Sequence, residues 1–187
     1  MLYLKGFSTL IADTLCPVQQ FIPSDTIDKI ALAHRRALGF RDDQMIDGMT
    51  LITKLKNRYP EFNYLRVPNG SLKDADAQWD DRKKLVTITE ATFSGINQEN
   101  PRSLFAVVHE VGHALLGHKG ILNRGPTSLV AASFSANLKR MERQANSYAA
   151  SFLMPDTQLL RTMTVEQIIK VYNVSREAAR IRWSQFR

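Results

Sequence analysis

The residues best suited to chemistry are His109, Glu110 and His113, which form an HExxH pentapeptide inside an apolar stretch. On a helix, residues four apart lie one above the other on the same face. The two imidazoles can therefore bind one metal ion, while Glu110 projects beside them as the general base for an attacking water. The spacing predicts part of a hydrolytic metal site, and a further ligand must come from another element.

A catalytic zinc site of this kind has three protein ligands and one open position. His118 is the nearest candidate, but it lies past the predicted end of the helix, where a solvent-facing histidine would interact favourably with the helix dipole. Glu142 is the better candidate, because Ala145 and Ala149 share its helix face and small side chains permit close packing. The alternative for Glu142 is an ordinary exposed charge beside Arg143.

Three neighbours of these candidates bear on the site. Gly112 costs about 1 kcal/mol relative to alanine inside a helix, and the close approach of a second helix would explain it. Asn146 lies on the same face as Glu142 and is predicted either to hydrogen-bond a ligand or to be a surface amide. Tyr148 is predicted to belong to the core.

The elements that position these residues follow from apolar spacing and from stop signals. Helices are predicted over residues 26–38, 44–58, 101–116, 137–153, 165–172 and 176–186. The first is expected to be capped by Ser24 and Asp25, and the third by Asn100. Strands are predicted over residues 62–67, 77–79 and 84–88, separated by turns, and Ile121–Ala136 is predicted to be a loop that could cover the cleft.

These elements predict an α+β fold, mostly helical and zincin-like, with a small antiparallel β-sheet before the HExxH helix. The chain of 187 residues fits one domain. Within it we expect a helical N-terminal part over 1–60, the sheet over 61–90, the metal-site helices over 100–155 and a C-terminal helix pair over 163–187.

Composition excludes several classes of protein. The single cysteine, Cys16, rules out an internal disulfide framework and a cysteine-rich zinc site. No apolar stretch approaches the roughly 20 residues that span a bilayer, and the N-terminal segment lacks a signal-peptide cleavage site. We therefore expect a cytoplasmic protein. Its net charge of +7 favours an acidic or nucleic-acid partner.

Two motifs in order resemble the ImmA/IrrE family of bacterial and phage metallopeptidases. That family has an HExGH helix and, about 30 residues later, a helix of the form Glu-x-x-Ala-Asn-x-Phe-Ala-Ala-x-Leu-Leu-Met-Pro. Residues 142–155 follow the second pattern, with Tyr148 in place of Phe and Phe152 in place of Leu. The resemblance extends from about Trp79 to Trp183 and implies that Glu142 is the third metal ligand.

The resemblance implies a zinc-dependent endopeptidase, with manganese as the other candidate metal. Family members are similar in cleaving helix-turn-helix repressors of the Xre/CI type, so such a repressor is the expected substrate. Two alternatives remain at this point. One is a metal-binding regulator without proteolytic turnover, and the other is a DNA-binding protein in which Arg176, Arg180 and Arg182 of the C-terminal helix pair meet phosphates. Against the DNA-binding alternative, Ala178, Ile181 and Trp183 could equally form an apolar stripe that faces the core.

Overall fold

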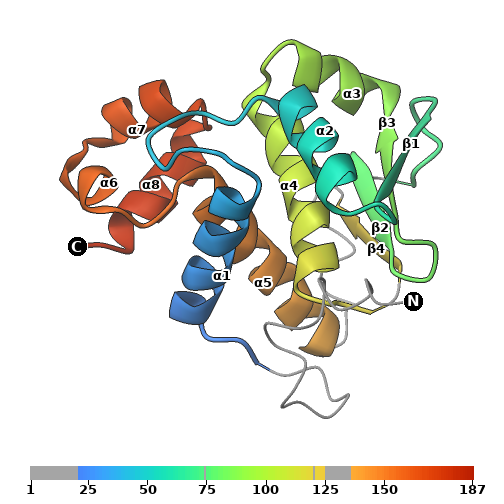
Figure 1. Cartoon of the computed structure of the whole chain (residues 1–187), viewed down its shortest axis with the longest axis horizontal. Coiled ribbons are helices and arrows are strands. Elements are labelled where there is room, and N and C mark those ends of the chain that lie inside the picture. The colour runs from blue at the N-terminus through green and yellow to red at the C-terminus, as the bar shows by residue number, and fades with distance from the viewer. Residues whose placement is uncertain (1–20, 74, 120, 125–135) are drawn as a thin grey trace.

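The fold of the chain is mostly helical, with one small sheet (Figure 1). The structure is a computed structural model, and it describes residues 21–73, 75–119, 121–124 and 136–187. The helices are α1 (Ser24–Ala37), α2 (Gly48–Arg58), α3 (Glu90–Asn97), α4 (Pro101–Leu115), α5 (Ala136–Leu153), α6 (Gln158–Thr162), α7 (Val165–Tyr172) and α8 (Arg176–Ser184). The strands are β1 (Asn63–Val67), β2 (Ala77–Asp80), β3 (Leu85–Thr89) and β4 (Ile121–Arg124). The α+β class predicted from the sequence is confirmed.

The sheet has the strand order β1-β3-β2-β4 and is mixed. The hairpin of β2 and β3 is antiparallel, as predicted, with Trp79 opposite Val86. The expectation of a wholly antiparallel sheet is wrong for β1, which pairs in parallel with β3, Leu65 lying opposite Thr87. The hairpin position on one side of β3 is taken by β2. The long connection that follows β1 lets β1 pair in parallel on the other side of β3.

One strand was not predicted. β4 lies inside the segment expected to be a loop, and it pairs antiparallel with β2, so that the sheet is completed after the metal-site helix and not only before it. Its four residues carry no clear alternation of apolar and polar side chains, which is the signal that sequence patterns rely on. The remainder of the predicted loop, residues 125–135, lies outside the described residues, as does Cys16.

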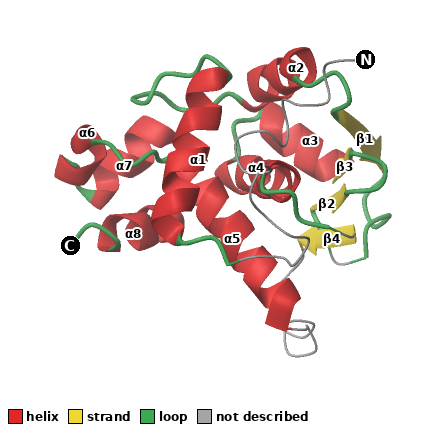
Figure 2. Cartoon of the chain, turned by 60° about the horizontal axis from the view of Figure 1, so that its bottom comes forward, coloured by secondary structure: helices red, strands yellow, loops and turns green. Residues whose placement is uncertain are grey.

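Helix α4 lies in the middle of the molecule (Figures 1 and 2). It packs on β2, β3 and β4 with one side and on α5 with another, and α5 packs in turn on α1. Leu104, Val107, Val108 and Val111 of α4 are all buried in the core that joins these layers. The helix carrying HExxH is therefore enclosed by the sheet on one side and by the helix carrying Glu142 on the other.

The ends of α4 follow the predicted chemistry. Asn100 caps it, its side chain accepting from the amides of Arg102 and Ser103, and Pro101 is the first helical residue. The predicted cap of α1 is wrong, because Ser24 is already helical and follows Pro23, whose side chain makes no cap hydrogen bond. Helices α3 and α6 were not predicted, since both are short and have weak periodicity.

Among the C-terminal elements, α7 packs on α8, and the pair contacts α1 and the segment that follows it. Helix α7 has the predicted bounds and a capping box between Thr164 and Gln167. Tyr172 at its end is buried, and its hydroxyl donates to the carbonyl of Asp42. Among the described residues, no helix has both the length and the apolar character needed to cross a membrane.

Candidate metal centre

The structure brings the three predicted metal ligands together. His109 and His113 project from α4 and are 0% exposed, and Glu142 projects from α5. Nε2 of His109 lies 3.0 Å from Nε2 of His113 and 3.1 Å from Oε2 of Glu142. Oε1 of Glu142 is 3.3 Å from Nε2 of His113. One potential ligand atom from each residue falls within 4.8 Å of the others, as a shared cation requires.

The charge of Glu142 suits a cation. Burial of its carboxyl group raises the pKa, but hydrogen bonding to His109 and His113 outweighs burial, and the pKa of Glu142 is lowered to about 2. The group is therefore ionised at neutral pH. A partly buried carboxylate facing two buried imidazole nitrogens needs positive charge at their meeting point, supplied by extra protons or by a metal cation.

The hydrogen bond at Nδ1 of His109 indicates whether extra protons or a metal cation would supply this positive charge. This Nδ1 atom lies 3.1 Å from the side-chain oxygen of Asn146, which can only accept a hydrogen bond. Nδ1 of His109 therefore carries the proton, and in the neutral ring Nε2 has a lone pair directed at Glu142. Such a contact is unfavourable between the two groups alone and favourable around a cation, so the donor set fits a divalent metal. Asn146 is the hydrogen-bond partner of a candidate ligand, one of the two roles predicted for it.

His118 lies in a different place from the one expected. The prediction of a solvent-facing histidine is wrong, because His118 is 5% exposed and its Nδ1 is 2.8 Å from Nδ1 of His113. Its Nε2 is 2.9 Å from the side-chain oxygen of Gln144 on α5. Burial and the nearby His113 lower the pKa of His118 to about 4, so the ring is neutral at neutral pH. His118 contacts a candidate ligand and does not belong to the cluster of possible ligands that the structure describes.

Glu110 is the remaining residue of the motif, and its side chain is fully buried on α4. It occupies the position after His109, on the helix that carries both candidate histidine ligands. A carboxylate beside a metal site is the type of group that can accept a proton from an attacking water. The role of Glu110 as a general base stays a prediction.

Gly112 is explained by the neighbouring helix. A Cβ atom at this position would lie 2.9 Å from Cδ1 and 3.3 Å from Cβ of Tyr148. Tyr148 is fully buried, as predicted for a core residue, and its hydroxyl is hydrogen-bonded to Nδ1 of His34 at 3.1 Å. The absence of a side chain at Gly112 thus allows α5 to approach α4 closely enough for Glu142 to reach the histidines.

Gly112→Ala is expected to destabilise the protein. Overpacking costs about 1–3 kcal/mol, and the gain of about 1 kcal/mol in helix propensity offsets only part of it. Urea denaturation of the metal-free protein measures the loss. The double variant Gly112→Ala with Tyr148→Leu should recover part of the stability that Gly112→Ala loses, because the two side chains are in contact. Gly112→Ala more stable than the wild type would contradict the close-approach explanation.

His34 is expected to make the stability depend on pH. Burial lowers the pKa of this imidazole from 6.5 to about 4 in the folded protein. Between these values the unfolded chain takes up a proton that the folded chain does not, so stability is complete above pH 6.5 and falls as the pH is lowered toward 4. Between pH 6.5 and 4, the melting temperature of His34→Gln should fall less steeply than that of the wild type. Identical slopes would exclude His34 as a source of the pH dependence of stability.

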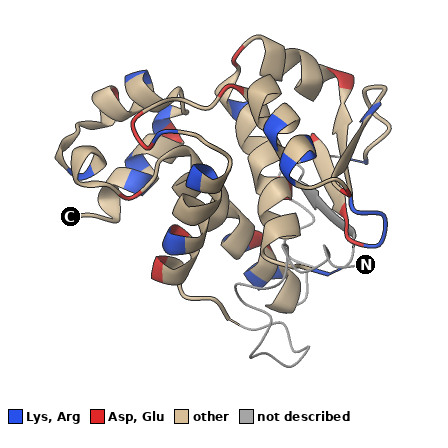
Figure 3. Ribbon diagram, in the orientation of Figure 1, with Lys and Arg blue, Asp and Glu red and all other residues tan. Residues whose placement is uncertain are grey.

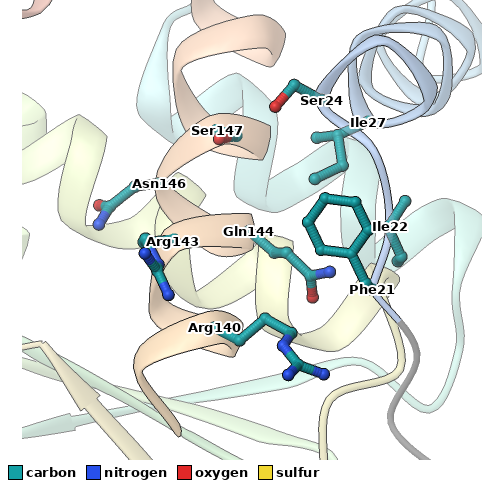
Figure 4. A pocket seen from close by; sticks show the side chains of 9 residues that line it. All are labelled: Phe21, Ile22, Ser24, Ile27, Arg140, Arg143, Gln144, Asn146 and Ser147. Atoms are coloured by element: carbon teal, nitrogen blue, oxygen red, sulfur yellow. The ribbon is translucent and has the colours of Figure 1, made fainter. Parts of the chain in front are cut away.

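A cavity of about 450 Å³ borders the site on the other side of α5 (Figure 4). It lies between α5 and the chain entering α1, where the side chains of Arg140 and Gln144 project toward Phe21. Gln144 and Asn146 both line this cavity and also contact His118 and His109. The cavity is thus adjacent to the residues that surround the candidate ligands, and its lining combines cationic, amide and apolar groups.

Of the three C-terminal arginines considered for phosphate binding, Arg182 is buried away from the surface, whereas Arg176 and Arg180 are exposed. Arg182 is 3% exposed and pairs with Asp28 at 2.7 Å, while its Nε donates to the carbonyl of Met154. Arg176 pairs with Glu166 at 2.9 Å. Lys and Arg residues are spread over several helices and the β2–β3 turn (Figure 3).

The stripe predicted to face the core also differs in part. Ala179 is the fully buried alanine of α8, Ala178 and Trp183 are partly buried, and Ile181 is 55% exposed. The indole of Trp183 donates to the carbonyl of Met163 at 3.1 Å. Helix α8 therefore packs on α7 through one narrow face and contacts the residue after α6 through Trp183, and the stripe begins one residue later than predicted.

Comparisons with known proteins agree with this geometry. Residues 78–184, more than half of the chain, match the family model of the IrrE N-terminal-like domain, which describes a family of peptidases. Among solved structures, the chain is similar to a Mycobacterium tuberculosis transcriptional regulator, with a TM-score of 0.55 and 17% identity. That match covers 88% of this chain and 47% of the regulator, so the chain spans about half of the regulator's length, and it supports the fold alone. None of the curated proteins matches the sequence.

Proposed function

The chain belongs to the IrrE N-terminal-like family of metallopeptidases, and on this premise we propose that it is a zinc-dependent endopeptidase that cleaves a helix-turn-helix repressor of the Xre/CI type. The observation that carries the proposal is the convergence of His109, His113 and Glu142 within 4.8 Å, from two helices held together by Gly112 and Tyr148. Manganese is the second candidate metal, because two imidazoles and a carboxylate accept several divalent ions.

The residues divide the work of peptide hydrolysis between them. A divalent cation held by His109, His113 and Glu142 would polarise the scissile carbonyl and lower the pKa of the attacking water toward neutrality. Glu110 accepts the proton of that water and then donates it to the leaving amine. Asn146 keeps the ring of His109 turned toward the site through the hydrogen bond to Nδ1.

A protein substrate suits the surroundings of the site. β4 follows α4 closely and pairs on one side with β2, while its other edge has no strand partner among the described residues. An extended segment of a substrate can add to such an edge by main-chain hydrogen bonds. The cavity beside α5 offers Arg140 and Arg143 to an acidic side chain of the substrate. A repressor acts on DNA, so the proposal places the reaction in the cytoplasm.

Cleavage of a purified helix-turn-helix repressor of the Xre/CI type tests the proposed function. The purified full chain, loaded with Zn²⁺ or Mn²⁺, is incubated with that repressor, and the products are followed by gel electrophoresis and mass spectrometry. Metal-dependent cleavage at one bond, abolished by a chelator, is the expected result. Bound metal without cleavage would contradict the proposal in favour of a metal-binding regulator.

The same preparation tests DNA binding by the C-terminal helix pair. Because Arg176 and Arg182 are engaged in ion pairs, we expect no salt-dependent DNA binding that survives the chelator. Arg180→Glu, a change at an exposed position of α8, should leave repressor cleavage unchanged. Chelator-resistant binding that this substitution abolishes would favour the DNA-binding alternative.

A further inference from the structure

The chain returns His118 to the metal-site helix through the turn that ends α4. The amide of His118 donates to the carbonyl of His113 at 2.9 Å, and the amide of Gly117 donates to the carbonyl of Ala114 at 3.2 Å. These are the two hydrogen bonds of a Schellman motif, and Gly117 has the left-handed φ of +70° that the motif requires. The residue after the glycine usually makes an apolar contact with the last turn of the helix. Here two imidazole rings meet instead, with centroids 5.0 Å apart.

The hydrogen bonds at this contact have a direction. The side-chain oxygen of Gln144 can only accept, so Nε2 of His118 carries a proton and donates to it at 2.9 Å. In a neutral ring Nδ1 of His118 is then an acceptor, and it takes the proton of Nδ1 of His113 at 2.8 Å. His113 is left with the lone pair on Nε2, the atom that faces His109 and Glu142.

Burial limits the ability of water to replace the hydrogen bonds between Gln144, His118 and His113. His118 and Gln144 are each 5% exposed, and His113 is fully buried, so bulk water has little access to the ring nitrogens. Gln144 comes from α5, which also carries Glu142, and His118 follows α4, which carries His113. The three side chains therefore tie the two helices of the metal centre together beside the ligands.

We propose that His118, supported by Gln144, is a positioning residue that fixes the tautomer and ring orientation of His113 and so raises the affinity of the site for its metal. The inference rests on the proposed function, because it requires His113 to be a ligand. A hydrogen bond to the outer nitrogen of a ligating histidine makes the ring a stronger ligand, and loss of such a partner lowers metal affinity by about 10–100-fold.

Two substitutions at His118 separate positioning from packing. His118→Phe fills a similar volume without an acceptor, whereas His118→Asn places an oxygen near the position of Nδ1 and can still accept from His113. The dissociation constant for Co²⁺ is measured by chelator competition, together with the visible absorption of the bound ion. We expect His118→Phe to bind about 10–100-fold more weakly with an altered spectrum, and His118→Asn to recover much of the affinity.

Further variants keep the test informative if His118→Phe folds poorly. Gln144→Leu leaves both histidines in place but removes the acceptor that orients His118, and it should also weaken Co²⁺ binding. Lys119→Ala changes an exposed neighbour and should bind as the wild type does. In the zinc-loaded wild type, long-range ¹H–¹⁵N spectra should show His118 protonated at Nε2 and not at Nδ1.

The outcomes distinguish this inference from the proposed function. Wild-type Co²⁺ affinity and spectrum in both His118→Phe and Gln144→Leu would overturn the positioning role while leaving the three-ligand site intact. His118 protonated at Nδ1 would also overturn it. A wild-type chain that binds neither Co²⁺ nor Zn²⁺ would refute the metal site itself, and the positioning role with it.

Discussion

Glu110→Gln is expected to bind metal as the wild type does and to cleave the repressor about 10²–10⁴-fold more slowly. The amide has nearly the same size and shape as the carboxylate, so the fully buried side chain can occupy the same space. It cannot accept a proton from water at neutral pH, which removes the general base. Single-turnover cleavage, with metal content determined on the same sample, measures both parts of the prediction.

The stability of this variant provides an internal control. A buried carboxylate is costly to desolvate, and a neutral amide of equal volume lowers that cost. The metal-free Glu110→Gln protein should therefore unfold at the same temperature as the wild type or at a higher one. Wild-type cleavage by a fully metal-loaded variant would exclude Glu110 as the base.

Glu142→Ala is expected to weaken metal binding by about 10²–10⁴-fold, because a cation held by two buried imidazoles would lose its anionic partner, and leaving such a charge unpaired costs about 3–5 kcal/mol. The two histidines would remain on α4 without the one anionic group that the structure places between them. Cleavage should be lost at metal concentrations that saturate the wild type. Isothermal titration with Zn²⁺ measures the affinity directly.

The stability of Glu142→Ala should respond to metal in a characteristic way. Binding to the folded state alone raises the melting temperature of the wild type when Zn²⁺ is added, and this rise should nearly vanish in the variant. Arg143→Ala, at the exposed neighbouring position of α5, is the matched control and should keep the full rise. An equal rise in Glu142→Ala would assign the third ligand to another residue.

The candidate site could be predicted where spacing on a helix determines geometry. His109 and His113 are four residues apart on α4, so their proximity follows from the helix alone. Glu142 lies on a second helix, and its position depends on the packing of α5 against Gly112, which no local pattern specifies. The resemblance to the ImmA/IrrE family pointed to Glu142, and the structure brings it to the histidines.

The predicted position of His118 was wrong for a physical reason. Its spacing from His113 does not fit a helix, because the chain leaves the helix at Gly117 and turns back. The glycine itself was a usable signal, since a Schellman motif brings the residue after it against the last helical turn. Its contact with Gln144 joins residues 26 positions apart and depends on tertiary packing.

The fold, like the site, could be predicted where local patterns determine it and not where long-range packing does. Helices α4 and α7 were predicted well because caps and periodicity mark both ends. The parallel pairing of β1 with β3 and the addition of β4 to β2 are long-range choices, which strand patterns leave open. Those choices place β4 at one edge of the sheet, in contact with α4.

The location of bound metal tests the central claim most directly. In a crystal of the zinc-loaded protein, anomalous difference density at the zinc edge should give one strong peak enclosed by Nε2 of His109, Nε2 of His113 and the carboxylate of Glu142. His118 should lie outside the coordination sphere, hydrogen-bonded to His113. A peak elsewhere, or one coordinated by His118 in place of Glu142, would contradict the three-ligand site.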